Sequence, residues 1–87
     1  SDMMAMAAIK ALTDHGLRVP EDCSVIAIDG LTTSEFTIPT LTTMVQPAEE
    51  MGRESVNILL DMIENHAAPR QLHLEAPLRR GGSVASV

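Results

Sequence analysis

Aromatic residues are almost absent from this chain of 87 residues, which contains one Phe and neither Trp nor Tyr. Aromatic side chains usually contribute a large share of the buried area in a small core. The core must therefore rely on aliphatic residues and on six Met residues, whose flexible side chains fill irregular gaps. We expect part of the apolar contacts to come from chain outside this sequence.

Cysteine and long apolar runs are also scarce. The single Cys23 excludes an internal disulfide, fits a reducing compartment, and is expected to be a small buried apolar group. The three histidines lie too far apart in the sequence to predict a metal site, and no motif predicts a cofactor. No apolar run approaches the ~20 residues of a membrane span. Asp2 stands where a secretory leader would be basic, so we expect a cytoplasmic protein.

Positive charge is in deficit, with six Lys and Arg residues against twelve Asp and Glu and a formal net charge of −6. Nucleic-acid binding needs a basic face, so the composition argues against direct contact between this segment and DNA. Arg70, Arg79 and Arg80 gather near the C-terminus. We expect them to mark a solvated end or to form intramolecular ion pairs, because three arginines alone are weak grounds for a phosphate site.

The apolar pattern predicts an α/β protein in which a helix, a strand, an extended segment, a second helix and a second strand follow one another. The first strand is continuously apolar rather than alternating, which favours a parallel strand covered on both faces. Asp2 is the predicted N-cap of the first helix. The predicted elements are a helix over 3–15, a strand over 23–28, an extended segment over 41–45, a helix over 47–65, a strand over 71–76 and a loose tail over 77–87.

Asp29 directly follows the apolar run and is the main candidate functional residue. Ligands of open α/β sheets bind beyond the carboxyl ends of the strands. A carboxylate there can accept hydrogen bonds from ligand hydroxyl or amine groups, and leaving such a bond unmade is costly. The alternative is that Asp29 caps a turn with Gly30. A catalytic strand-end Asp would need further acids, a Lys or a Thr at set distances, so we expect no enzyme and name no catalytic residue.

Three segments together carry a resemblance to a known family. "GLRVPEDCSVIAID", "PTLTTMVQP" and "MGRESVNILLDMI", in this order and spacing, resemble the C-terminal part of LacI/GalR-family transcriptional regulators over residues 1–78. The resemblance implies a fragment of a Rossmann-like, periplasmic-binding-protein-like fold, incomplete on its own. By the same resemblance, residues 1–44 belong to a C-terminal subdomain, residues 47–76 belong to an N-terminal subdomain, and the tail 77–87 returns to the first.

The resemblance also implies two effector-binding residues. Asp29 matches the strand-end acid that reaches the effector, and Ser1 matches a position that is commonly Asn. The chain departs from the family pattern at three positions. Ile28 stands where the family often has an aromatic residue, Gly30 where it has a second acid, and Gly81 where it has an arginine.

A homodimer or higher homo-oligomer is implied as well. The resemblance places five residues at a subunit interface: Met6, Lys10, Phe36, Thr37 and Ile38. It implies a regulator that responds to a small molecule of the sugar or purine class and binds DNA only through a headpiece outside this chain. Two alternatives stay open, namely a segment of a periplasmic sugar-binding protein of an ABC transporter, and an inactive fragment that only oligomerises.

Overall fold

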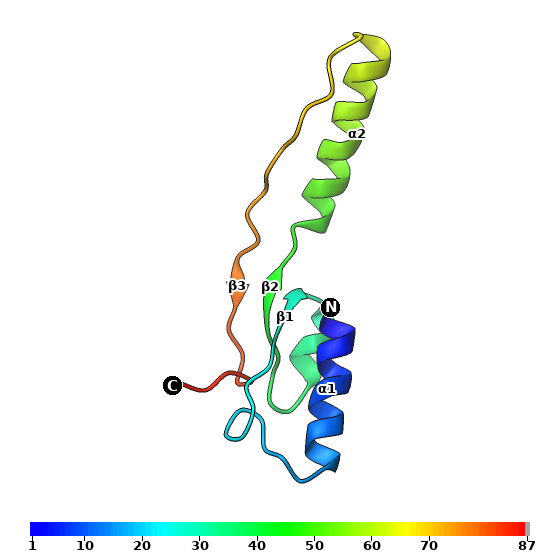
Figure 1. The fold of residues 1–87 in the computed structure, drawn as a ribbon. Coiled ribbons are helices and arrows are strands. Elements are labelled where there is room, and N and C mark those ends of the chain that lie inside the picture. Colours follow the sequence, from blue (N-terminus) through cyan, green and yellow to red (C-terminus); the bar gives the residue numbers. More distant parts are fainter. Residues whose placement is uncertain (87) are drawn as a thin grey trace. The chain divides into compact units, whose positions relative to one another are not determined.

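The computed structural model describes residues 1–86, which form two compact units (Figure 1). The first unit comprises Ser1–Gln46 and the C-terminal segment that begins at Pro77, and the second comprises Pro47–Ala76. The second unit is thus inserted into the first. The assignment of the two units to the two subdomains of a larger core stays a prediction.

A three-stranded sheet forms the centre of the first unit, in the order β1-β2-β3. The strand β1 (Ile26–Asp29) runs parallel to β2 (Thr42–Val45), and β2 pairs in the antiparallel direction with the short β3 (Leu78–Arg79). The 3-10 helix η1 (Thr32–Phe36) lies in the connection between β1 and β2. Parallel pairing of β1 with β2 confirms the predicted α/β class.

The helix α1 (Asp2–Asp14) covers one face of this sheet. Ala5 and Ile9 of the helix pack into a small core with Ala27 of β1 and with the fully buried Leu41. Side chains alternate between the two faces of a strand, so the neighbours of Ala27 point the other way. Ile26 and Ile28 are 62% and 53% exposed, and the prediction that β1 is covered on both faces is therefore wrong for this chain.

Two further local predictions are wrong. Cys23 is exposed, because β1 begins only at Ile26 and the residues before it form a surface turn. The alternating segment 71–76 is not a strand, since α2 is the only regular element described in the unit 47–76 and a strand needs a neighbouring strand to bond with. The strand that follows α2 in the chain is instead β3, which lies in the tail that was expected to be loose.

The tail 77–86 is ordered by contacts with the first unit. Ser83 is fully buried, and the amide of Gly82 donates to the carbonyl of Thr40 at 2.8 Å. A Cβ added at Gly81 would overlap the same carbonyl oxygen of Thr40. Close backbone packing therefore requires glycine at the position where the family pattern has an arginine.

The helix α2 (Ala48–Glu64) matches the prediction of a helix over 47–65 to within one residue at each end. Pro47 is its N-cap residue, and Glu49 and Glu50 in its first turn complement the positive end of the helix dipole. The segment after the helix is tied back to it, because Arg70 forms an ion pair with Asp61 at 2.9 Å. Within residues 1–86, no helix is both long and apolar enough to cross a membrane.

Candidate functional site

The candidate site lies at the carboxyl edge of the sheet, where β1 and β2 end together. Asp29 and Val45 are the last residues of these strands and are partners in the register. The amino end of α1 lies at the same edge, since the backbone amide of Asp2 donates to Oδ2 of Asp29 at 3.0 Å. The carboxylate of Asp29 thus accepts a hydrogen bond from the first turn of α1, where the helix dipole favours negative charge.

The carboxylate of Asp2 in turn binds the backbone of the turn that follows Asp29. One carboxylate oxygen of Asp2 accepts from the amides of Gly30 at 3.1 Å and Leu31 at 2.8 Å. The other accepts from the hydroxyl of Thr43 on β2 at 2.5 Å. The turn amides are bound by Asp2, so the alternative in which Asp29 caps its own turn is wrong.

The predicted N-cap is also wrong. Ser1 is the N-cap residue of α1, and its hydroxyl accepts from the amide of Met4 at 3.4 Å. The side chain of Asp2 turns inward and is fully buried. Burial by itself raises the pKa of this carboxyl, but the hydrogen bonds from Thr43 and from the turn amides outweigh it and hold the pKa below the usual value of 3.8. Asp2 is therefore a buried anion at neutral pH.

Gly30 is required by the geometry of this edge. Its φ of +79° lies in the left-handed region, and an added Cβ would lie 2.6 Å from the Cα of Val45. In this chain the backbone of the turn passes directly over the end of β2. A second acid, as in the family pattern, does not fit here.

The two residues predicted to bind an effector lie at this one edge. Asp29 is half-buried, and among the residues that the structure describes its Oδ1 has no hydrogen-bond partner. Ser1 is exposed and directly precedes Asp2, whose amide binds Asp29. The free acceptor at Oδ1 can bind a hydroxyl or amino group that approaches from the carboxyl edge of the sheet.

The predicted dimer residues gather around a second surface. Four of them, together with Ile9 and Thr13, line a hollow of about 320 Å³ between α1 and the loop after η1: Met6, Lys10, Thr37 and Ile38. The neighbouring Phe36 is 75% exposed and Ile38 is 93% exposed. An exposed apolar pair at the end of η1 and in the loop that follows it is typical of a contact surface, and the interface role of these residues stays a prediction.

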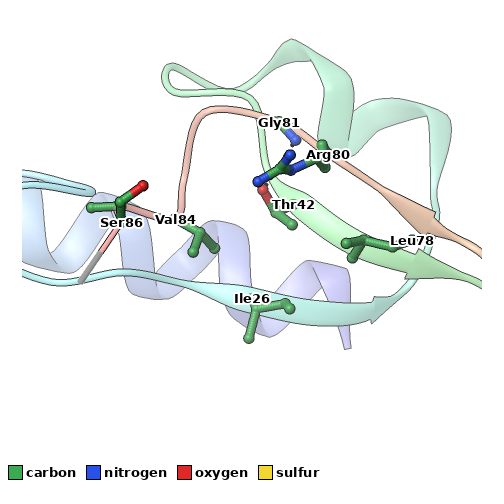
Figure 2. Close-up of a pocket in the computed structure, with 8 residues that line it drawn as sticks. Ile26, Thr42, Leu78, Arg80, Gly81, Val84 and Ser86 are labelled. Carbon is green, nitrogen blue, oxygen red and sulfur yellow. Dashed lines mark hydrogen bonds between the residues drawn. The ribbon is translucent and has the colours of Figure 1, made fainter.

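The sequence reasoning missed a hollow of about 310 Å³ on the face of the sheet away from α1 (Figure 2). Figure 2 shows Ile26, Leu78 and Val84 as its apolar lining, with Arg80 and Thr42 as polar groups beside them. The signal that could have found it is the alternating direction of successive side chains along β1, because only every second side chain can face α1.

Arg79 is a second residue whose role was only partly predicted. From β3 its guanidinium donates to the carbonyl of Leu31 at 3.2 Å and to the hydroxyl of Ser34, and it pairs with Glu35 at 3.3 Å. The prediction of intramolecular ion pairs is confirmed for Arg79. No group of three or more His, Cys, Asp or Glu side chains within residues 1–86 could hold a metal ion.

Comparison with known proteins adds to this geometry. A family model of the periplasmic binding protein-like domain matches residues 1–84. The chain is 52% identical over 63 residues to the HTH-type transcriptional repressor PurR of Haemophilus influenzae, an alignment that covers 72% of this chain and 19% of that repressor. The chain spans about a fifth to a quarter of the length of the curated relatives it matches.

Solved structures of transcriptional regulators have the same fold. The transcriptional regulator CelR–cellobiose complex matches with a TM-score of 0.89 at 40% identity, covering 95% of this chain and 26% of that chain. The lac repressor dimer bound to operator and the anti-inducer ONPF matches with a TM-score of 0.90 at 34% identity, covering 99% of this chain and 30% of that chain.

Proposed function

Because this chain belongs to the periplasmic-binding-protein-like domain family, we propose that it is a segment of the effector-binding and dimerisation core of a LacI-family transcriptional regulator. The observation that carries the proposal is Oδ1 of Asp29, which has no hydrogen-bond partner within residues 1–86 and lies at the carboxyl ends of the parallel strands β1 and β2, where ligands of such sheets bind. The similarity to repressors supports a regulator over both an enzyme and a segment of a sugar transporter.

The effector is a small molecule with hydroxyl or amino donors, of the sugar or purine class. A donor on the ligand binds Oδ1 of Asp29, while Oδ2 stays on the amide of Asp2. Ser1 adds a second polar group at the same edge. The similarity to a regulator solved with cellobiose supports a sugar hydroxyl as the donor.

Effector binding and DNA binding are coupled in the whole protein. An effector that binds one arrangement of the core more tightly shifts the balance between arrangements, and the affinity for DNA changes with it. The segment itself carries a net charge of −6, so DNA contacts belong to a headpiece outside this chain. Such a regulator acts in the cytoplasm as a homodimer or higher homo-oligomer, with its subunit contacts at the hollow between α1 and Ile38.

The test is ligand titration by calorimetry of the full-length protein and of Asp29→Asn, with cellobiose as the sugar probe and hypoxanthine as the purine probe. In Asp29→Asn the single amide oxygen must stay on the amide of Asp2, so an NH₂ group meets the donor of the ligand. We expect the probe that binds to bind at least about tenfold more weakly to the variant.

Asp14→Asn is the matched control, because it removes the same charge from an exposed acid on α1 that pairs with Lys10. Its affinity for the probe should equal that of the wild type. Equal affinities for wild type and Asp29→Asn would show that Asp29 is not a ligand contact. Binding of neither probe would contradict the proposed effector classes.

A further inference from the structure

We propose that Asp2 is a positioning residue for the ligand contact, which holds Asp29 and the turn 29–31 in the conformation that leaves Oδ1 of Asp29 available. The inference rests on the proposed function of Asp29. It assigns a role to a residue that the sequence indicated only as a helix cap. Asp2 itself does not touch the ligand, because its side chain is fully buried beneath the turn.

The first observation is the number of groups that one carboxylate joins. Three donors from two other parts of the unit bind the side chain of Asp2, namely two turn amides and the hydroxyl of Thr43 on β2. A buried carboxylate is costly unless donors satisfy it. The donors that satisfy Asp2 are the groups that define the conformation of the turn, so the burial of Asp2 and the shape of the turn depend on each other.

The second observation is that Asp29 is fixed from both sides by the same residue. The amide of Asp2 holds Oδ2 of Asp29, and the carboxylate of Asp2 holds the amides of the two residues that follow Asp29. The side chain and the outgoing backbone of Asp29 therefore cannot rotate independently of the amino end of α1. Loss of the Asp2 carboxylate would release the outgoing backbone of Asp29 without changing any chemical group of Asp29 itself.

Two substitutions of Asp2 differ in how many of its hydrogen bonds they can keep. In Asp2→Asn the amide oxygen can accept from Gly30 and Leu31, while the NH₂ group can donate to the hydroxyl oxygen of Thr43. In Asp2→Ala all three donors lose their partner. The turn should therefore keep its conformation in Asp2→Asn and lose it in Asp2→Ala.

The experiment uses the full-length protein and two readouts. Hydrogen–deuterium exchange should be about tenfold or more faster at the amides of Gly30 and Leu31 in Asp2→Ala, and close to wild type in Asp2→Asn. Calorimetry with the probe that binds wild type, cellobiose or hypoxanthine, should show affinity about tenfold weaker in Asp2→Ala and within about twofold in Asp2→Asn. If Asp2→Ala does not fold, Asp2→Ser takes its place, because the shorter side chain cannot reach all three donors.

The variant Ser83→Ala distinguishes the positioning role of Asp2 from a general loss of stability. It removes two hydrogen bonds at the opposite end of β1 and leaves the turn intact. If Ser83→Ala weakens probe binding as much as Asp2→Ala, the positioning role is overturned. It is also overturned if Asp2→Ala binds the probe like wild type while Asp29→Asn does not, and in that case the proposed function stands. If Asp29→Asn itself binds like wild type, the proposed function fails first.

Discussion

Ser83 and Val25 bind each other in both directions across 58 positions of sequence. The amide of Val25 donates to the carbonyl of Ser83 at 2.8 Å, and the hydroxyl of Ser83 donates to the carbonyl of Val25 at 2.6 Å. The same hydroxyl accepts from the amide of Thr42 at 2.8 Å. One buried hydroxyl thus joins the beginnings of two parallel strands.

Replacing Ser83 with Ala should destabilise the first unit. The change leaves the amide of Thr42 and the carbonyl of Val25 without the hydroxyl that serves both, and each unsatisfied buried group costs about 1–3 kcal/mol. Urea unfolding followed by circular dichroism should show a loss of at least about 1 kcal/mol and up to about 6 kcal/mol for the two groups together. The control is Ser86→Ala, since Ser86 is exposed and its change should stay within about 0.5 kcal/mol. Equal stability of the two variants would contradict the structural role of Ser83.

Arg79 should stabilise the segment between β1 and β2. Its guanidinium binds Leu31 and Ser34 and pairs with Glu35, so Arg79→Met removes a charged donor from three acceptors. We expect a loss of about 1–3 kcal/mol in the free energy of unfolding and faster hydrogen exchange across η1. The neighbouring Arg80→Met is the control, because the side chain of Arg80 is exposed at the rim of the hollow in Figure 2. If both variants unfold alike, the contacts of Arg79 contribute nothing specific.

Acid should weaken the fold through Asp2. The folded pKa of Asp2 lies below 3.8, its value in the unfolded chain, so the unfolded state binds more protons in acid. The stabilisation is fully present above about pH 4 and is lost as the pH falls from 3.8 through the folded pKa. Asp2→Asn carries no titrating group at this site, so its free energy of unfolding should fall less steeply between pH 4 and pH 2. Parallel curves for wild type and variant would contradict this prediction.

The proposed dimer surface should be sensitive to charge at Ile38. This side chain is 93% exposed beside an apolar hollow, and Ile38→Asp in the full-length protein would place a carboxylate in the proposed subunit contact. Dimerisation should weaken about tenfold or more, which light scattering after size exclusion would show as a shift to monomer at micromolar concentration. Met4→Asp is the control, because Met4 is 74% exposed on α1 outside that hollow. A dimer unchanged by Ile38→Asp would place the interface elsewhere.

Local sequence patterns predicted those elements whose signals lie within a few residues. The apolar run that ends at Asp29 predicted a strand at this position, and the Pro47 and paired-Glu signal predicted α2 nearly to the residue. The position of Asp29 at a sheet edge followed from the end of the apolar run, and its candidate ligand role followed from the rule that ligands bind beyond the carboxyl ends of the strands. These inferences needed no knowledge of which segments meet in space.

The remaining features depend on partners far apart in the sequence. Asp2 was predicted to be an ordinary helix cap because the donors that its carboxylate binds lie 28 to 41 positions away in the sequence. Ser83 reads as part of a loose polar tail for the same reason. The exposed face of Ile26 and Ile28 was mispredicted because an apolar run shows what a strand could bury and not what covers it.

The insertion of residues 47–76 into the first unit has a consequence for synthesis on the ribosome. The chain leaves the first unit after Gln46 and returns at Pro77, and the amide of Val45 bonds to the carbonyl of Pro77 at 2.8 Å where the two crossings meet. Neither β3 nor the Ser83 hydroxyl exists while translation is still within α2. The parallel pair β1–β2 must therefore wait for residues 77–83 to emerge from the exit tunnel before its third strand and its hydroxyl bridge can form.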